Sequence, residues 1–352
     1  MKLHSFCAAN SGDGFISFFD TLLDERNQKV YYIKGGPGCG KSTLMRSLAE
    51  QTDEAELIHC SGDPDSLDGV IIPKKNAVII DATSPHSHEP CYPGVGGNLI
   101  DLGVIWNPSK LNKDKIIQLT DQKRFLYQNC YNVLNSAKYI FNGVFQPIKH
   151  SIDVQRLKTI GNKILVQNAL WEATNQKPNV NKRFLNGITP KGLICYSDTI
   201  LDLCSNVIVL EDRWMISDYL LKYINELLSM RGIDHIAAYH PLLGKNTLQH
   251  IIIPSASLAI LTKDGIFPLD IEDERISRKI NLQALIAKDF LNDHKNKLRF
   301  MKKMICELID SAVEQLSEIK AIHACIENEY SIGADYTKVD LINKNLSNIL
   351  FG

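Results

Sequence analysis

The sequence lacks the features that mark several other protein classes. Its charges nearly cancel, with 39 Lys+Arg against 40 Asp+Glu, so the overall charge does not favour a nucleic-acid partner. It has no apolar run long enough to span a membrane, and Met1–Phe6 lacks the apolar core of a secretory signal. The nine cysteines include no C-x-x-C pair, which gives no support to a zinc site. We therefore expect a cytoplasmic protein with reduced thiols and with no membrane or nucleic-acid partner.

One glycine-rich stretch carries a specific signal. The run from Gly35 to Thr43 fits G-x-x-x-x-G-K-[ST], the phosphate-binding P-loop. The apolar run Val30–Ile33 before it predicts a buried strand, and Leu44–Glu50 after it has helical composition and apolar spacing. A strand, a glycine-rich turn and a helix are the arrangement that this motif requires.

The residue types in this stretch predict how it holds a nucleoside triphosphate. Glycines let successive backbone N–H groups wrap a polyphosphate, and the helix N-terminus adds a partial positive charge. Lys41 would reach the β- and γ-phosphates, and the Ser42 hydroxyl would hold Mg²⁺. Cys39 either fills a variable position or has its pKa lowered by the loop amides, which would expose it to oxidation. The predicted nucleotide-binding residues are Gly35, Gly36, Pro37, Gly38, Cys39, Gly40, Lys41, Ser42 and Thr43.

A second P-loop feature follows in Ala77–Asp81, which consists of four apolar residues and an aspartate. In a parallel sheet this Walker B strand would place the Asp81 carboxylate near Ser42, and the two would bind Mg²⁺. We therefore predict Lys41 and Asp81 as catalytic residues, and Ser42 and Asp81 as metal ligands.

The residue after Asp81 is Ala82, whereas many P-loop ATPases have a glutamate there that polarises the attacking water. The segment that follows offers substitutes, and His86 is the leading candidate for a catalytic γ-phosphate sensor or base. The alternative is a loop histidine satisfied by local hydrogen bonds. The other candidates are Thr83, His88 and Glu89. The histidines and Glu89 also suggest a metal, but no further ligand cluster supports that interpretation.

The chain contains an internal repeat. Phe15–Leu22 resembles Leu193–Ile200, and Leu67–Pro73 resembles Leu248–Pro254. Each copy is followed by apolar residues at helical spacing. We therefore predict an α/β fold with two related P-loop-type parallel-sheet lobes, each followed by amphipathic helices. The predicted segments are a nucleotide-binding lobe at 1–106, a helical segment at 107–178, a degenerate P-loop-like lobe at 179–270 and a helical segment at 271–352.

The second copy has no intact P-loop. Glu211–Asp218 has no glycine and no lysine at the key position, and its carboxylates would repel a triphosphate. Thr262 stands opposite Asp81, so the Walker B aspartate is also missing. We interpret this lobe as a structural or regulatory pseudo-site, with Arg213 as an arginine finger for the first site as the alternative.

Three stretches, Lys34–Thr43, Ile58–Pro73 and Asp81–His86, resemble a poorly characterised bacterial family of tandem P-loop ATPases. The resemblance covers nearly the whole chain and implies two related P-loop halves, each followed by helices, with ATPase activity. Members of that family usually carry an intact second P-loop, from which this chain departs.

Within the second of these stretches, Asp63, Asp65 and Asp68 lie on a segment that we predict to be a polar loop. Such a loop would bind a cation or a substrate amine, or form a solvated turn, which Pro64 and Gly69 favour.

The function expected from these features is Mg²⁺-dependent binding and hydrolysis of a nucleoside triphosphate. ATP is the default and GTP the alternative, because the guanine signature Asn/Thr-Lys-x-Asp is not evident. Two other functions fit the same residues. The first is a small-molecule or nucleotide kinase, which agrees with Ala82 in place of a water-activating glutamate. The second is a nucleotide-binding regulator that does not hydrolyse its ligand.

Overall fold

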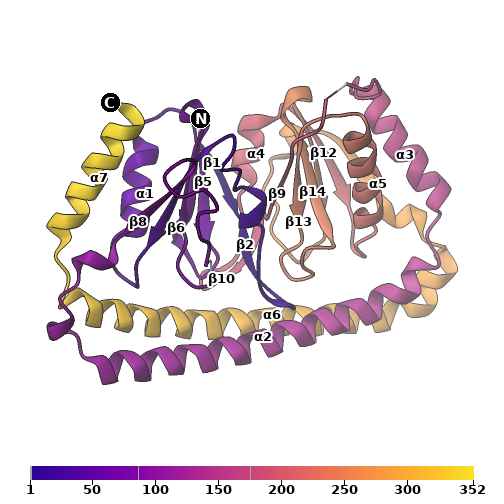
Figure 1. The fold of residues 1–352 in the computed structure, drawn as a ribbon. Helices are drawn as coiled ribbons and strands as arrows, with labels where there is room; N and C mark the ends of the chain where they lie inside the picture. Colours follow the sequence, from indigo (N-terminus) through magenta and orange to yellow (C-terminus); the bar gives the residue numbers. More distant parts are fainter. Residues whose placement is uncertain (1, 86, 175) are drawn as a thin grey trace.

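The computed structural model describes residues 2–85, 87–174 and 176–352, and it contains two α/β lobes that lie side by side (Figure 1). Each lobe is built on a six-stranded sheet, and two long helices run beneath both lobes. The predicted α/β class with two related lobes is confirmed. No helix in the described part of the chain combines the length and the apolar character needed to pass through a bilayer.

The first sheet has the strand order β1-β5-β6-β7-β4-β8. Its strands are β1 (Lys2–Phe6), β4 (Lys29–Lys34), β5 (Ala55–Cys60), β6 (Asp63–Ile72), β7 (Ala77–Asp81) and β8 (Gly97–Asp101). β6 is antiparallel to both neighbours, whereas every other pair is parallel. The sheet is mixed because the connections on either side of β6 are too short for the crossover that a parallel pair needs.

The second sheet repeats this arrangement with the order β9-β13-β14-β15-β12-β16. Its strands are β9 (Val180–Arg183), β12 (Asn206–Glu211), β13 (His235–Tyr239), β14 (Leu248–Ile253), β15 (Leu258–Lys263) and β16 (Ile276–Asn281). β14 is antiparallel to its neighbours, as β6 is in the first sheet. The repeat found in the sequence is therefore a repeat of the fold.

Each lobe also has a small hairpin with a two-residue turn. The hairpins are formed by β2 (Ala8–Ser11) with β3 (Gly14–Ser17) and by β10 (Asn186–Thr189) with β11 (Gly192–Cys195). Gly14 and Gly192 have φ of +84° and +100°, which an L side chain rarely adopts. These glycines mark the equivalent turns of the two repeats.

The helices of one repeat pack partly on the lobe of the other. They are α1 (Lys41–Glu50), α2 (Lys113–Lys149), α3 (Val154–Gln167), α4 (Ser197–Leu203), α5 (Ser217–Met230), α6 (Lys288–Ser331) and α7 (Tyr336–Phe351). α2 carries the chain from the first lobe to the second, where α3 packs on α5. α6 returns along α2, and α7 packs beside α1 on the first lobe (Figure 1).

Short 3₁₀ helices link several of these elements. They are η1 (Phe19–Thr21), η2 (Pro73–Lys75), η3 (Gly103–Ile105), η4 (Pro108–Lys110), η5 (Pro254–Ala256), η6 (Asp273–Arg275) and η7 (Leu282–Leu285).

The exchange of helices completes both hydrophobic cores. Leu346 and Leu350 of α7 join Leu44 and Leu48 of α1 in the core of the first lobe. The burial of one such side chain contributes about 1.5–3 kcal/mol. The end of the second repeat is therefore an integral part of the lobe that carries the P-loop.

Candidate functional site

The P-loop sequence lies in the structural context that its chemistry requires. β4 ends at Lys34, the loop follows, and α1 begins at Lys41. Gly38 and Gly40 have φ of +70° and +87°, so the loop has the left-handed turns that point successive N–H groups to one side. No side chain caps the start of α1, which leaves its first N–H groups for a ligand.

Lys41 and Asp81 meet at the end of this loop. The Lys41 Nζ donates to the carbonyl oxygens of Gly35 and Gly36 at 2.8 and 2.9 Å. The same atom lies 3.6 Å from Asp81 Oδ2, because β7 pairs in parallel with β4 and brings Asp81 beside Ile33. Burial raises the pKa of Asp81, and the Lys41 charge opposes that shift. The structure thus brings together the two predicted catalytic residues that it describes.

Ser42 and Asp68 lie next to this pair. The Ser42 Oγ accepts a hydrogen bond from the Leu67 N–H at 2.9 Å. Asp68 is buried, and the antiparallel pairing of β6 with β7 ends at Gly69 and Ile80, so Asp68 and Asp81 are the next residues on the two strands. The negative charge of Asp68 is a further cause of the raised Asp81 pKa. Asp68 therefore belongs to the P-loop site as a second carboxylate, a role that its sequence position did not reveal.

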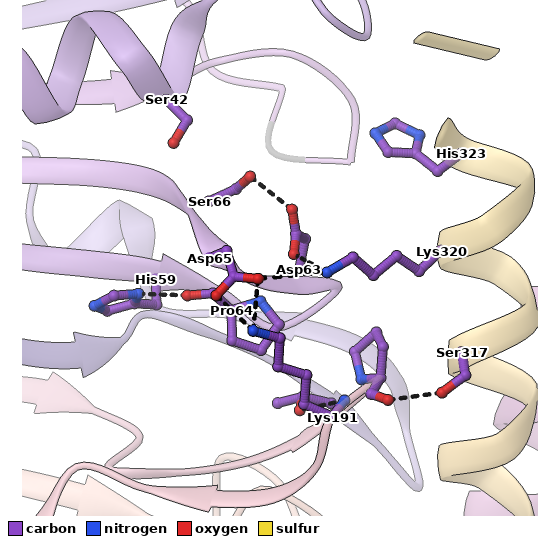
Figure 2. Close-up of polar contacts among 12 residues, drawn as sticks. Ser42, His59, Asp63, Pro64, Asp65, Ser66, Lys191, Ser317, Lys320 and His323 are labelled. Carbon is purple, nitrogen blue, oxygen red and sulfur yellow. Dashed lines mark hydrogen bonds and ion pairs between the residues drawn. The ribbon is translucent and has the colours of Figure 1, made fainter. Parts of the chain in front are cut away.

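The predicted acidic loop is instead the start of strand β6, and its other two aspartates bind lysines of the second repeat. Lys320 of α6 lies 2.6 Å from Asp63 Oδ1, and Lys191 lies 2.6 Å from the Asp65 carboxylate (Figure 2). Ser66 donates to Asp63 at 2.8 Å. These contacts tie β6 to the helical pair and to the β10–β11 turn, so protein ammonium groups are the partners of this segment.

Three polar side chains on the long helices face the P-loop, and sequence reasoning missed all of them. Lys123 of α2 lies 3.3 Å from His323 Nδ1 on α6, and His323 Nε2 lies 3.7 Å from Glu327 Oε1. Burial lowers the pKa of His323 to about 4, helped by the charges of Lys123 and Lys41. The only sequence signal was the spacing of four residues between His323 and Glu327, which places them on one helix face.

The loop is covered by Trp106 and by the start of α7. A Cβ on Gly36 would lie 2.7 Å from the Trp106 ring, so glycine is required there for close packing. Tyr336 of α7 donates to the Gly38 carbonyl oxygen at 3.1 Å, and a Cβ on Gly40 would lie 3.3 Å from Val339. The second repeat therefore contacts the glycine-rich loop of the first repeat directly.

The other candidates near Asp81 have different roles. His86 lies outside the described residues. Thr83 donates to the Gly35 carbonyl oxygen at 2.8 Å, which holds the loop against the end of β7. Glu89 is exposed and pairs with Lys34 at 2.6 Å, and His88 lies 3.4 Å from Asp20. Among the described residues, no group of three or more histidines, cysteines or carboxylates could hold a metal.

The environment of Cys39 differs from the hypothesis that the loop amides lower the pKa of its thiol. Its side chain is buried, and burial raises the pKa of its thiol in spite of the nearby Lys41. Desolvation therefore outweighs the loop amides, and the hypothesis of a lowered pKa is wrong.

In the second lobe, a carboxylate occupies the position that corresponds to the predicted phosphate site of the first lobe. Asp212 follows β12 and is fully buried, and it accepts hydrogen bonds from the Trp214 N–H at 2.9 Å and the Ser217 N–H at 2.6 Å. Ser217 is the first residue of α5. The backbone donors that would cradle a phosphate are therefore already bound to an anionic side chain.

One contact confirms that the two loops are equivalent. The Leu248 N–H donates to Asp218 Oδ1 at 2.8 Å, as the Leu67 N–H donates to the Ser42 hydroxyl in the first lobe. Asp218 thus replaces Ser42.

Arg213 does not reach the first site. It lines a small cavity with Trp214 and with Lys302 of α6. Glu327, which contacts the P-loop, lies about 37 Å further along that helix at about 1.5 Å per residue. The arginine-finger interpretation is therefore wrong.

Comparisons of the chain with protein-family models, with curated proteins and with solved structures find no match.

Proposed function

We propose that this protein binds and hydrolyses a Mg²⁺-nucleoside triphosphate at the P-loop of the first lobe. ATP is the default nucleotide and GTP is the alternative. The observation that carries the proposal is the glycine-rich turn between β4 and α1, with Lys41 Nζ 3.6 Å from Asp81 Oδ2. A partly buried ammonium, a carboxylate on the adjacent strand and an uncapped helix N-terminus suit a triphosphate better than a neutral ligand.

The residues present fit the metal and the phosphates. Backbone N–H groups of the loop and Lys41 would bind the phosphates, and Ser42 with Asp81 would hold Mg²⁺, with Asp68 beside them. The ion would neutralise charge that develops on the transferred phosphoryl group. Because Lys41 now donates to the Gly35 and Gly36 carbonyl oxygens, it would exchange those bonds for phosphate oxygens.

The second lobe would act as a structural or regulatory pseudo-site. Asp212 already accepts the N–H of Ser217 at the start of α5, so a phosphate there would have to displace a buried carboxylate. We further propose that the chain is related to the tandem P-loop ATPases and works in the cytoplasm. The free cysteines throughout the described residues agree with a reducing compartment.

Transfer of the γ-phosphate to a small molecule is the second candidate function. It is favoured by the buried Ala82, which leaves no carboxylate directly after Asp81. An assay with γ-labelled ATP and candidate acceptors distinguishes the two, since a hydrolase releases inorganic phosphate without an acceptor.

The decisive variant for nucleotide binding is Lys41→Ala. Saturation at a hundred times the Kd stabilises a protein by about 2.7 kcal/mol, so Mg²⁺-ATP should raise the Tm of the wild type and not of the variant. Lys74→Ala is the matched control, because Lys74 is 57% exposed and lies in η2, before β7 begins. Equal Tm shifts in the wild type and Lys41→Ala would refute the site. Binding without phosphate release or transfer would favour a regulator.

A further inference from the structure

The hydrolysis proposed above needs a group that accepts a proton from water, and the usual position does not supply one. Ala82 is fully buried in the core, and its N–H donates to the Ile33 carbonyl oxygen at 2.9 Å. A side chain in that place would point into the hydrophobic core rather than toward the P-loop. The position directly after Asp81 therefore supplies no base.

Glu327 of α6 is the carboxylate that meets the loop from the opposite side. A Cβ on Gly38 would lie 3.3 Å from the Glu327 Cβ and 3.4 Å from its carbonyl oxygen. The Gly38 N–H lies close enough to the Glu327 carboxylate to lower its pKa. That N–H is one of the loop donors that would wrap a triphosphate, so Glu327 lies beside the part of the loop where the phosphates are expected.

The surroundings of Glu327 suit a proton acceptor. Burial raises its pKa, as does the charge of Asp63, whereas the Gly38 N–H, Lys41 and Lys123 lower it. A base with a raised pKa takes a proton from water more readily. His323 lies 3.7 Å from the carboxylate and contacts Lys123, so the two helices hold the glutamate within a polar cluster.

The other carboxylates near the loop form contacts with other groups. Asp81 contacts Lys41, Asp63 is paired with Lys320 at 2.6 Å, and Glu89 is exposed and paired with Lys34. Asp68 is buried beside Asp81 on the metal side of the site.

We propose that Glu327, supplied by the second repeat, is the general base for hydrolysis at the P-loop of the first lobe. The inference rests on the proposed hydrolase function. The water oxygen forms a bond to the γ-phosphorus as its proton passes to the Glu327 carboxylate. The bond between the γ-phosphorus and the bridging oxygen breaks, and its electron pair stays on the nucleoside diphosphate. The glutamate then releases the proton to solvent.

The test compares Glu327→Gln with Glu329→Gln in the full-length chain. Glu329 lies on the same helix and pairs with Lys115 at 2.5 Å, so its substitution controls for the loss of a negative charge on α6. The readouts are kcat for phosphate release from Mg²⁺-ATP and the Kd of a fluorescent ATP analogue. Loss of a general base lowers kcat by about 10²–10⁴-fold, and the Kd should change by less than about threefold. Glu329→Gln should keep both values.

Each other outcome overturns the inference in a distinguishable way. An unchanged kcat in Glu327→Gln refutes the base, while the wild-type activity leaves the hydrolase proposal standing. Tighter nucleotide binding with undiminished kcat identifies Glu327 as a competitor for the Gly38 N–H instead. If the wild type binds ATP but releases no phosphate, both the proposed general base and the proposed hydrolase function are refuted.

Glu327→Asp guards against a folding defect in the glutamine variant. It keeps the charge but withdraws the carboxylate by one methylene, so it should retain the wild-type Tm and recover part of the kcat. A Glu327→Asp variant as active as the wild type, together with an inactive and unfolded glutamine variant, would assign Glu327 a structural role.

Discussion

A buried ion pair that joins the two lobes is open to a quantitative test. Arg183 of β9 donates to Glu56 of β5 through both Nε at 2.6 Å and Nη2 at 2.9 Å. Arg183 is only 2% exposed, and Ser5 donates to the same carboxylate at 2.8 Å. The two six-stranded sheets therefore meet through a bidentate, charge-assisted contact.

Glu56→Gln should destabilise the protein strongly. The guanidinium of Arg183 stays charged at any working pH, and it would remain buried against an amide that offers only one acceptor atom. Removal of one partner of a buried pair costs about 3–5 kcal/mol, and we expect the lower end because glutamine keeps one hydrogen bond.

Urea unfolding of the full chain measures this loss. Asp273→Asn is the control, because Asp273 is 82% exposed and pairs with Lys279 at 2.9 Å, and an exposed pair contributes less than about 1 kcal/mol. The double variant Glu56→Gln/Arg183→Met should be more stable than Glu56→Gln alone, since it removes the uncompensated charge. A loss below about 1 kcal/mol in Glu56→Gln, or no recovery in the double variant, would refute this reasoning.

The same pair makes a prediction for pH. Burial raises the pKa of Glu56, but the Arg183 charge and the hydrogen bonds from Arg183 and Ser5 outweigh burial, so the folded pKa lies below its usual 4.5. The contribution of Glu56 to stability is therefore complete above pH 4.5 and is lost as the pH falls through the folded pKa. Glu56→Gln should remove this part of the acid sensitivity.

Two further predictions concern the P-loop lobe. Cys39 should react with iodoacetamide more slowly than the exposed Cys91 and Cys325, because it is buried with a raised pKa; mass spectrometry that finds Cys39 labelled first would contradict this. Leu346→Ala on α7 should lower the free energy of unfolding by about 2–5 kcal/mol, because Leu346 fills the core of the first lobe. Ile349→Ala, at a position 64% exposed, is its control, and equal losses in the two variants would show that α7 does not complete this core.

The parts of the fold that local sequence determines were predictable. The strand before Gly35 and the helix after Gly40 follow from apolar spacing and glycine placement alone. The start of β6 was not predictable as a strand, because Pro64 and the polar residues around it, such as Asp63, have the composition of a turn. Ladder hydrogen bonds to β5 override that composition, with register shifts near His59 that accommodate the irregular segment.

The parts of the site that depend on long-range packing left little trace in the sequence. Glu327 and Tyr336 reach Gly38 only because α6 crosses back along α2 to the first lobe, and no local pattern encodes that path. Asp68 was assigned to an acidic turn with Asp63, because side-chain direction depends on a strand register that was not known. The strand, turn and helix around the P-loop motif could be read from its residues, whereas the groups on the opposite side of it could not.

The exchanged helices explain why the second repeat is needed although its loop lacks the glycines and the lysine of the P-loop motif. Asp212 blocks the cradle of the second lobe, yet the same repeat places Tyr336 and Glu327 against the first P-loop and Leu346 in the core beneath it. The first repeat in turn covers α5 of the second lobe with α3. Neither lobe has a complete core from its own repeat alone. The P-loop of the first repeat and the residues of the second repeat that surround it therefore have to be inherited together. A change in the second lobe that shifts α6 along α2 would thereby change the position of Glu327 at the P-loop.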